Sequence, residues 1–318
     1  ALDDPEARQA LVLMAPRAVG LGVTQITFIV VTALATGLGA PAVAAFSIAF
    51  GLLQLPLGLV SIPLGIVLLP ALSEWAAKES DGAFVRALTQ VLRLLLFLMV
   101  AIAGLLAAVS HQLVAILLPT YDPANAAMVG GTFFVFLGGL PAHAMIAILA
   151  RAFYARQNTR TPVMLAIMAV VINTTVAATL VGPFGLGGIA AGIALAAWAE
   201  VGGLLLLLRR AVPGLVLEGL GRTALHVVTA AGLSFAAAVA VVEVIRRSFG
   251  PGAGIIPAIG EVGAAALAYA FVLLLVSQLL RSTEPGEALA FVRAAVRRGT
   301  LNTEYGNDDS GAAGGLIG

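Results

Sequence analysis

Three arginines, Arg151, Arg156 and Arg160, lie in the short segment RAFYARQNTRTPV between two long apolar runs. A guanidinium binds an anion such as phosphate through two parallel hydrogen bonds and stays charged, so these side chains could hold an anionic ligand. They could instead do no chemistry and only keep a short loop on the cytoplasmic side of a membrane. Tyr154, beside Phe153, stands where an aromatic belt at a membrane–water interface is expected.

A second group of polar residues lies inside the apolar runs themselves: Arg17, Gln25, Gln54 and Glu200. Glu200, in AAWAEVGGLLLL, is the most deeply placed charge, and an acid at the centre of a bilayer costs roughly 2.5–3.5 kcal/mol on insertion scales. We expect it to face protein or water, either in a cavity with a proton-linked role or in a hydrogen bond between helices. Arg17 could contact an anionic ligand or extend to the cytoplasmic surface. Gln25 and Gln54 are weaker cavity candidates.

The remaining polar residues in these runs give no sign of catalysis. His143 could titrate near neutral pH, although a packed histidine is the simpler interpretation, and Asn173 could join helices by a hydrogen bond worth roughly 0.6 kcal/mol. No HExxH or GxSxG motif occurs, and the three histidines fall in different segments. Without cysteine there are no disulfides or thiolate ligands. The sequence therefore predicts no catalytic residue, no metal site and no cofactor.

Composition places these residues in a membrane protein. Hydrophobic residues make up 60% of the 318-residue chain, charged residues 10%, and the mean hydropathy is +1.05. A soluble domain carries about 25% charged residues. The apolar runs are continuous and lipid offers no hydrogen bonds to an open backbone, so we predict an all-α polytopic integral membrane protein. A net charge of +1 with scattered basic residues predicts no nucleic-acid partner.

Eight apolar runs are long enough for transmembrane helices, since roughly 20 residues cross a hydrocarbon core about 30 Å thick. Turn residues separate them, and Thr161 before Pro162 predicts an N-cap. The segment GPFGLGGIAAG predicts a tight hairpin rather than a phosphate-binding loop, because a helix and not a strand precedes it. The predicted spans are 12–36, 42–72, 88–109, 127–150, 163–182, 186–208, 223–245 and 258–280.

The basic residues predict the orientation of these spans. With eight spans, every lysine and arginine except Arg246 and Arg247 falls on one side of the membrane. Cytoplasmic loops are enriched in Lys and Arg, so we expect that side, and both ends of the chain, to be cytoplasmic. The acidic start ALDDPEARQ lacks the basic character of a signal peptide and an initiator Met, and leads us to expect that the chain belongs to a longer protein.

The second run, FGLLQLPLGLVSIPLGIVLLPALSEW, has glycines and prolines that each recur every seven residues. Seven residues are nearly two helical turns, so each set forms a stripe along one face. Small residues allow close helix approach, and prolines free carbonyl groups and kink a helix. The run is therefore either a deformable helix that lines a cavity or a helix-packing seam. Its stripes are Gly51, Gly58 and Gly65, and Pro56, Pro63 and Pro70.

Four segments resemble the MurJ (MviN) lipid II flippase family of the multidrug/oligosaccharidyl-lipid/polysaccharide exporter superfamily. They are PRAVGLGVTQITFIV at 16–30, LPLGLVSIPLGIVLLPALSE at 55–74, FYARQNTRTPV at 153–163 and GPFGLGGIAAGIALA at 182–196. The resemblance covers about 1–210. It implies two six-helix lobes around a central cavity plus a final helix pair, fourteen spans in all, of which this chain would supply the second lobe and the pair.

The resemblance divides the chain into a lobe at 1–210, an accessory helix pair at 211–280 and a cytoplasmic segment at 281–318. The last segment contains EALAFVRAAVRRG at 287–299, which predicts an amphipathic helix on the anionic inner leaflet, and a polar tail that predicts disorder. The implied activity is movement of an undecaprenyl-pyrophosphate-linked saccharide across the bacterial cytoplasmic membrane, with no enzymatic step. The implied partners are that lipid-linked saccharide, membrane lipids and the first lobe of the same protein.

One departure from the family is visible before the LPLG run. The family carries an Asp-Arg pair there, whose arginine faces the cavity, with an acid three residues later; Phe50, Gly51 and Gln54 stand at these positions here. This lobe therefore lacks one expected cationic ligand. Three alternatives remain open: the other lobe carries the anion site, the protein exports another polyprenyl-linked saccharide, or it is a non-transporting scaffold or assembly subunit.

Overall fold

The computed structural model describes residues 22, 25–77, 81–212, 218–249, 254–280 and 286; within them all regular structure is helical and no strand occurs. A helical segment, Gln25–Thr36, comes first. The elements that follow it are α2 (Ala40–Pro56), η1 (Leu57–Ser61), α3 (Ile62–Ala77), α4 (Asp81–Ala108), α5 (Ser110–Leu117), α6 (Pro123–Leu137), α7 (Leu140–Ala155), α8 (Arg160–Phe184), α9 (Leu186–Ala211), α10 (Glu218–Phe249) and α11 (Ile255–Leu279). Arg17, the predicted amphipathic helix at 287–299 and the polar tail lie outside the described residues.

Six of the eight predicted spans correspond to single helices that are long and apolar enough to cross a membrane. The predicted span at 127–150 is instead two helices, α6 and α7, that meet at an angle of 46°. Counting this bent pair as one span gives seven. Of the predicted span at 12–36, the structure describes only the 12-residue apolar helix Gln25–Thr36, so the count of eight is not confirmed.

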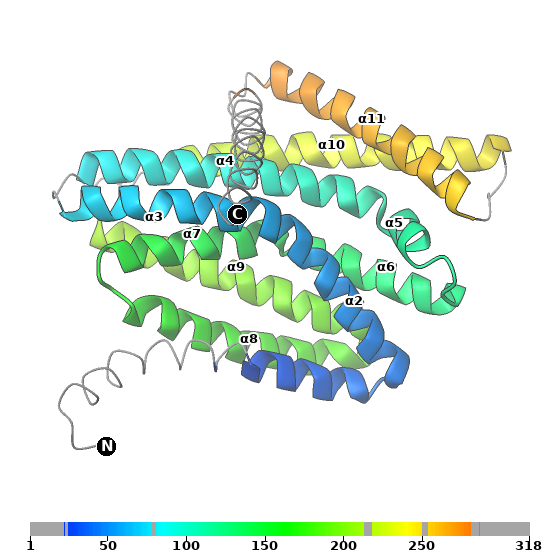
Figure 1. The fold of residues 1–318 in the computed structure, drawn as a ribbon, viewed down its shortest axis with the longest axis horizontal. Helices are drawn as coiled ribbons and strands as arrows, with labels where there is room; N and C mark the ends of the chain where they lie inside the picture. The colour runs from blue at the N-terminus through cyan, green and yellow to red at the C-terminus, as the bar shows by residue number, and fades with distance from the viewer. Residues whose placement is uncertain are drawn as a thin grey trace, which may run out of the picture.

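The helices run roughly parallel to one another in a flattened bundle (Figure 1). The helical segment Gln25–Thr36 and α8 form one edge, and α10 with α11 forms the opposite edge. Between them, α7 packs against α9, α4 and α3, and α9 packs against α8. The accessory pair reaches the rest of the molecule mainly through α4 and α5.

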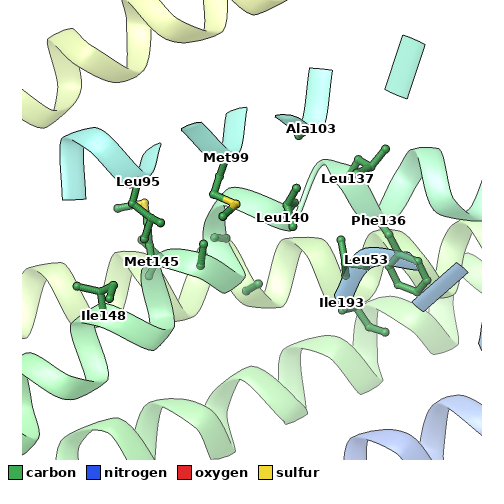
Figure 2. Close-up of a cluster of buried hydrophobic side chains, with 14 of the residues drawn as sticks. Leu53, Leu95, Met99, Ala103, Phe136, Leu137, Leu140, Met145, Ile148 and Ile193 are labelled. Carbon is green, nitrogen blue, oxygen red and sulfur yellow. The ribbon is translucent and has the colours of Figure 1, made fainter. Parts of the chain in front are cut away.

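The core lies around α7, which is buried along most of its length. Leu140, Met145 and Ile148 from α7 meet Leu95 and Met99 from α4 (Figure 2). Since lipid tails are as apolar as leucine, burial alone does not hold such helices together in a membrane, and close van der Waals packing has to do so. The interlocking side chains of α4, α6, α7 and α9 meet that requirement.

The Gly/Pro run forms one continuous helical path through α2, η1 and α3. The π-helical turn η1, Leu57–Ser61, starts directly after Pro56 and ends two residues before Pro63. Proline lacks the N–H of the regular helical ladder, and π turns occur where that ladder is disrupted, often at functional sites. Pro56 is buried, whereas Pro63 and Pro70 are exposed. The prediction of a locally deformed helix is consistent with this geometry.

Close packing joins α8 and α9 into a tight hairpin. Gly185 has φ 55°, which favours glycine, and turns the chain between the two helices. At Gly188 the backbone carbonyl of Leu180 occupies the space that a β-carbon would need. The close approach of the two helices therefore depends on glycine, as the sequence indicated. The predicted N-cap at Thr161 is wrong: α8 begins at Arg160, and the Thr161 N–H donates to Asn158 Oδ1 at 3.1 Å.

Candidate functional site

A cavity of about 300 Å³ lies among the helical segment Gln25–Thr36 and helices α2, α7, α8 and α9. Most of its wall is apolar, with side chains such as Phe50 and Ile193. Four polar side chains also line it: Thr27, His143, Asn173 and Glu200. A mainly apolar pocket with a few convergent polar groups is the usual form of a ligand site.

Two of these polar side chains carry buried atoms with no hydrogen-bond partner among the described residues. They are His143 Nε2 and both amide atoms of Asn173. Leaving a buried polar group unpaired costs about 1–3 kcal/mol, so folded proteins rarely do it without a reason. Because both residues line the cavity, their polar groups are the candidates for contact with a ligand or with water. The sequence predicts that Asn173 joins helices by a side-chain hydrogen bond. Within the part of the chain that the structure describes, its side chain makes no hydrogen bond.

The break between α6 and α7 positions His143. Pro141 stands in the first turn of α7, which begins directly after Gly138 and Gly139. Because the helix is interrupted there, the Gly138 carbonyl oxygen is free to accept a hydrogen bond from Trp198 Nε1 at 2.8 Å. Trp198 lies on α9 two residues before Glu200, so this bond ties the helix bend to the wall that carries the acid.

Glycine at the α8–α9 contact positions Asn173. A β-carbon on Gly192 would lie 3.0 Å from both Asn173 Oδ1 and the Ala177 backbone nitrogen. The small residue lets α9 approach α8 at the level of Asn173, which is only 2% exposed. The amide is thus held in place by packing rather than by hydrogen bonds.

An aromatic cluster forms another part of the cavity wall. The Phe50 ring contacts those of Phe28 at 5.1 Å, Phe46 at 5.9 Å and Phe136 at 5.8 Å between centroids. Three of these rings, Phe28, Phe46 and Phe50, line the cavity. Where the family resemblance implies an aspartate, this chain therefore places an aromatic side chain packed among three others.

Glu200 is the one charged side chain in the described lining, which contains no lysine or arginine. A carboxylate can accept hydrogen bonds or pair with a positive charge, and it repels phosphate. The described wall of this cavity thus suits a proton, a cation or the donor groups of a saccharide better than a pyrophosphate. Among the described residues, no three His, Asp or Glu side chains come together as metal ligands would.

The sequence-predicted cavity residues lie in different places. Glu200 lines the cavity, whereas Gln25 and Gln54 are exposed and outside its lining. His143, which the sequence indicated as simply packed, and Asn173, interpreted as a helix contact, share the cavity with Glu200. No spacing in the sequence could have grouped them, because they come from three separate helices.

The arginines of the RAFYAR segment lie outside the cavity lining, at the ends of α3, α4 and α7. The Arg151 guanidinium lies directly against Gly65 on α3, and its Nη1 donates to the Ala147 carbonyl oxygen at 3.2 Å. The Arg156 guanidinium lies over the Phe84 ring at 5.6 Å from its centroid, a cation–π distance. Arg151 therefore joins the two patterned segments of the sequence.

The other residues of these two segments differ in their contacts. Arg160 and Tyr154 are exposed, while Phe153 is buried in the core and is not part of an aromatic belt. A β-carbon on Gly51 or Gly58 would meet no atom of the described residues within 4 Å. Within the part of the chain that the structure describes, Gly65 is therefore the one glycine of the stripe in close contact with a neighbour.

Comparison with known proteins identifies the family. The model of the family described as "Lipid II flippase MurJ" matches residues 1–256. The probable lipid II flippase MurJ of Rhizobium tropici is 28% identical over 196 residues, which are 61% of this chain and 37% of that protein. The corresponding protein of Rhizobium meliloti (strain 1021) is 29% identical over 196 residues, 61% of this chain and 36% of the relative.

A solved structure described as lipid II flippase MurJ in an inward closed conformation has the same fold. Its TM-score is 0.66 at 16% identity, and the match covers 85% of this chain and 54% of that one. This chain spans somewhat more than a third of the length of the two Rhizobium relatives. Since the family model covers most of the chain, the chain belongs to the lipid II flippase MurJ family.

Proposed function

We propose that this chain forms the second lobe and the accessory helix pair of a flippase that moves a lipid II-type polyprenyl-pyrophosphate saccharide across a bacterial cytoplasmic membrane. Sugars and pyrophosphate cannot cross hydrocarbon, so such a protein needs a polar cavity inside an apolar helix bundle. The observation that carries the proposal is the cavity between α2, α7, α8 and α9, with His143, Asn173 and Glu200 on its wall.

In this proposal the cavity of this lobe does not hold the pyrophosphate by itself. Its described lining has a carboxylate and no cationic side chain. The anion is held by arginines elsewhere, for which Arg17 and a first lobe of the same protein are the candidates. Glu200 acts in a cavity or proton-linked role, with His143 and Asn173 beside it.

Alternating access requires a helix that can bend, and the α2–η1–α3 path supplies one. The α2 half carries Phe46 and Phe50 on the cavity wall, and the α3 half contacts Arg151 through Gly65, in its first turn directly after the π turn. The π turn between the two halves is where the hydrogen-bond ladder is already irregular. We therefore place the bending point at Leu57–Ser61. In the same scheme the RAFYAR segment and both chain ends are cytoplasmic.

A non-transporting scaffold or assembly subunit is the second candidate. The observation that favours it is Phe50, which fills with an aromatic cluster the position where the family resemblance implies an acid. An exporter of another polyprenyl-linked saccharide is a variant of the first candidate with the same cavity.

Complementation of a flippase-depleted bacterium with the full-length gene tests the proposal. We expect growth to be restored and external labelling of the lipid-linked precursor to return. Immunoblotting of membranes from the same cells is the control for expression and insertion. If the protein is present in the membrane at normal abundance and precursor still accumulates inside, lipid II transport is excluded and the scaffold or another saccharide is favoured.

A further inference from the structure

An ion pair between a buried carboxylate, Glu261, and a half-exposed arginine, Arg246, lies where α10 and α11 meet α5, outside the cavity lining. Glu261, near the start of α11, is only 5% exposed. Arg246, in the last turn of α10, donates to it from Nε at 3.1 Å to each carboxylate oxygen and from Nη2 at 2.8 Å to Oε2. Gln112 of α5 donates from Nε2 to the same Oε2 at 3.1 Å. The Glu261 carboxylate of α11 thus accepts hydrogen bonds from both α10 and α5.

This arrangement is specific in a way that an apolar contact is not. A charge that is taken out of water needs a partner and further hydrogen bonds, and losing one partner leaves an uncompensated charge. Apolar helix faces can slide past one another at little cost, whereas Glu261 keeps its bonds only when α10, α11 and α5 are in one relative position. Such a group fixes the relative position of the helices that pack around it more than it adds to the free energy of unfolding.

Two further contacts lie along the same docking surface. The Tyr269 side chain of α11 fills the space that a β-carbon on Gly104 of α4 would occupy. Its hydroxyl has no hydrogen-bond partner among the described residues, so Tyr269 acts by shape. Near the middle of α4, Arg93 Nε donates to Thr223 Oγ1 of α10 at 3.0 Å. The helices α10 and α11 therefore contact α4 and α5 at three places along their length, at Arg93, Gly104 and Gln112.

We infer that the Gln112–Glu261–Arg246 network makes the accessory helices a fixed part of this lobe, so that α10 and α11 move with α4 and α5 as one body. Glu261 is the positioning residue of this junction. The inference rests on the proposed function only in its consequence for transport, where the accessory pair would follow the lobe through the cycle. The junction itself can be tested without any transport assay.

The matched control is an exposed ion pair on the same end of α10. Glu243 Oε1 accepts from Arg247 Nε at 2.7 Å, with side chains 53% and 77% exposed. Exposed pairs of this kind contribute little. In the purified full-length protein in nanodiscs, we expect E261Q, which weakens the charge-assisted bonds at Glu261, to lower the apparent Tm by roughly 3–6 °C. We expect E243Q to change it by less than about 2 °C.

Spin-label distances test whether the pair is fixed. The chain has no cysteine, so cysteines introduced at the exposed positions Val171 on α8 and Ile256 on α11 report on the lobe and the pair. A second double-cysteine variant, with labels at Val171 and at Leu117, an exposed residue of α5, is the reference within the lobe. We expect equally narrow distance distributions for both label pairs, and a broadened Val171–Ile256 distribution in E261Q but not in E243Q.

Two results would overturn the inference. One is a Val171–Ile256 distribution in the unsubstituted background that is clearly broader than the Val171–Leu117 reference. The other is an E261Q protein with the same Tm and the same distribution as E243Q. If E261Q does not fold, the exchanged pair R246E/E261R takes its place, and it should recover at least half of the folded yield if the network acts as described.

Discussion

The accessory junction and the lobe cavity differ in how their buried carboxylate, imidazole and amide side chains are paired. At the accessory junction, Glu261 is bonded to Arg246 and to Gln112. In the lobe cavity, His143 Nε2 and the Asn173 amide have no hydrogen-bond partner within the described residues. Both regions lie within apolar helices, where an unpaired polar group is expensive. Paired polar groups indicate a structural role, and unpaired polar groups on residues that line a cavity indicate a candidate ligand site.

The largest difference between the two regions is expected when the acid in each of them, Glu261 or Glu200, is replaced by glutamine. E261Q replaces the charge-assisted hydrogen bonds from Arg246, whose side chain is 44% exposed, by weaker neutral ones, and we expect a loss of roughly 1–2 kcal/mol in the free energy of unfolding. E200Q removes a charge with no ion pair among the described residues, so we expect a change within about 0.5 kcal/mol, or a small gain. Thermal unfolding of both variants in nanodiscs gives the comparison. Equal losses in the two would show that Glu200 is also structural.

Replacing the buried amide side chain in each region, Gln112 or Asn173, by leucine should change the free energy of unfolding in different directions. Gln112→Leu deprives Glu261 of one hydrogen bond and should cost about 1–3 kcal/mol. Asn173→Leu removes unpaired polar atoms, and we expect it to be neutral or to stabilise by up to about 1 kcal/mol. Both can be measured by the same unfolding experiment. A strongly destabilised Asn173→Leu would mean that its amide has a structural partner.

In a third region, Gly65 and the Arg151 guanidinium are in close contact with no hydrogen bond between them. Gly58→Ala places a methyl group in open space and should stabilise the helix by up to about 1 kcal/mol through its higher helix propensity. Gly65→Ala forces the Arg151 guanidinium to move, which should cancel that gain and cost up to about 1 kcal/mol in addition. Equal unfolding temperatures for the two alanine variants would rule out a tight contact between Gly65 and the Arg151 guanidinium.

The smallest effect is expected from replacing Arg151, Arg156 and Arg160 together by lysine. Lysine keeps the positive charge, so the loop should stay on the same side of the membrane, and activity should remain within about twofold if the arginines act only through charge. Site-specific labelling of the loop from either side reads the topology, and complementation reads the activity. Loss of activity with unchanged topology would show a role in which the planar guanidinium matters.

The long helices were predictable because each is a continuous apolar run bounded by turn residues. The bend between α6 and α7 was not predicted, although Gly138, Gly139 and Pro141 mark it. Their effect depends on whether neighbours satisfy the freed backbone, as Trp198 does for Gly138, and that is a tertiary property.

The candidate site was only partly predictable, for a related reason. Glu200 was found because a lone acid in an apolar run is costly. Gln25 and Gln54 were weaker candidates, and both are exposed and outside the cavity lining. A helix that is apolar on all sides has no hydrophobic face from which to infer orientation. Which face of α7, α8 or α9 meets the cavity is decided by packing, so grouping His143, Asn173 and Glu200 required the fold.

The most direct test of the account is the rate at which the full-length protein moves a polyprenyl-pyrophosphate saccharide across proteoliposome membranes, with and without E200Q. The account predicts that the unsubstituted protein is active and that E200Q is slower by about tenfold or more, a rise of ~1.4 kcal/mol or more in the activation barrier, with an unchanged unfolding temperature. E243Q, which alters an exposed acid outside the cavity, should transport at the normal rate. Equal rates for E200Q and the unsubstituted protein would contradict the claim that this cavity serves transport.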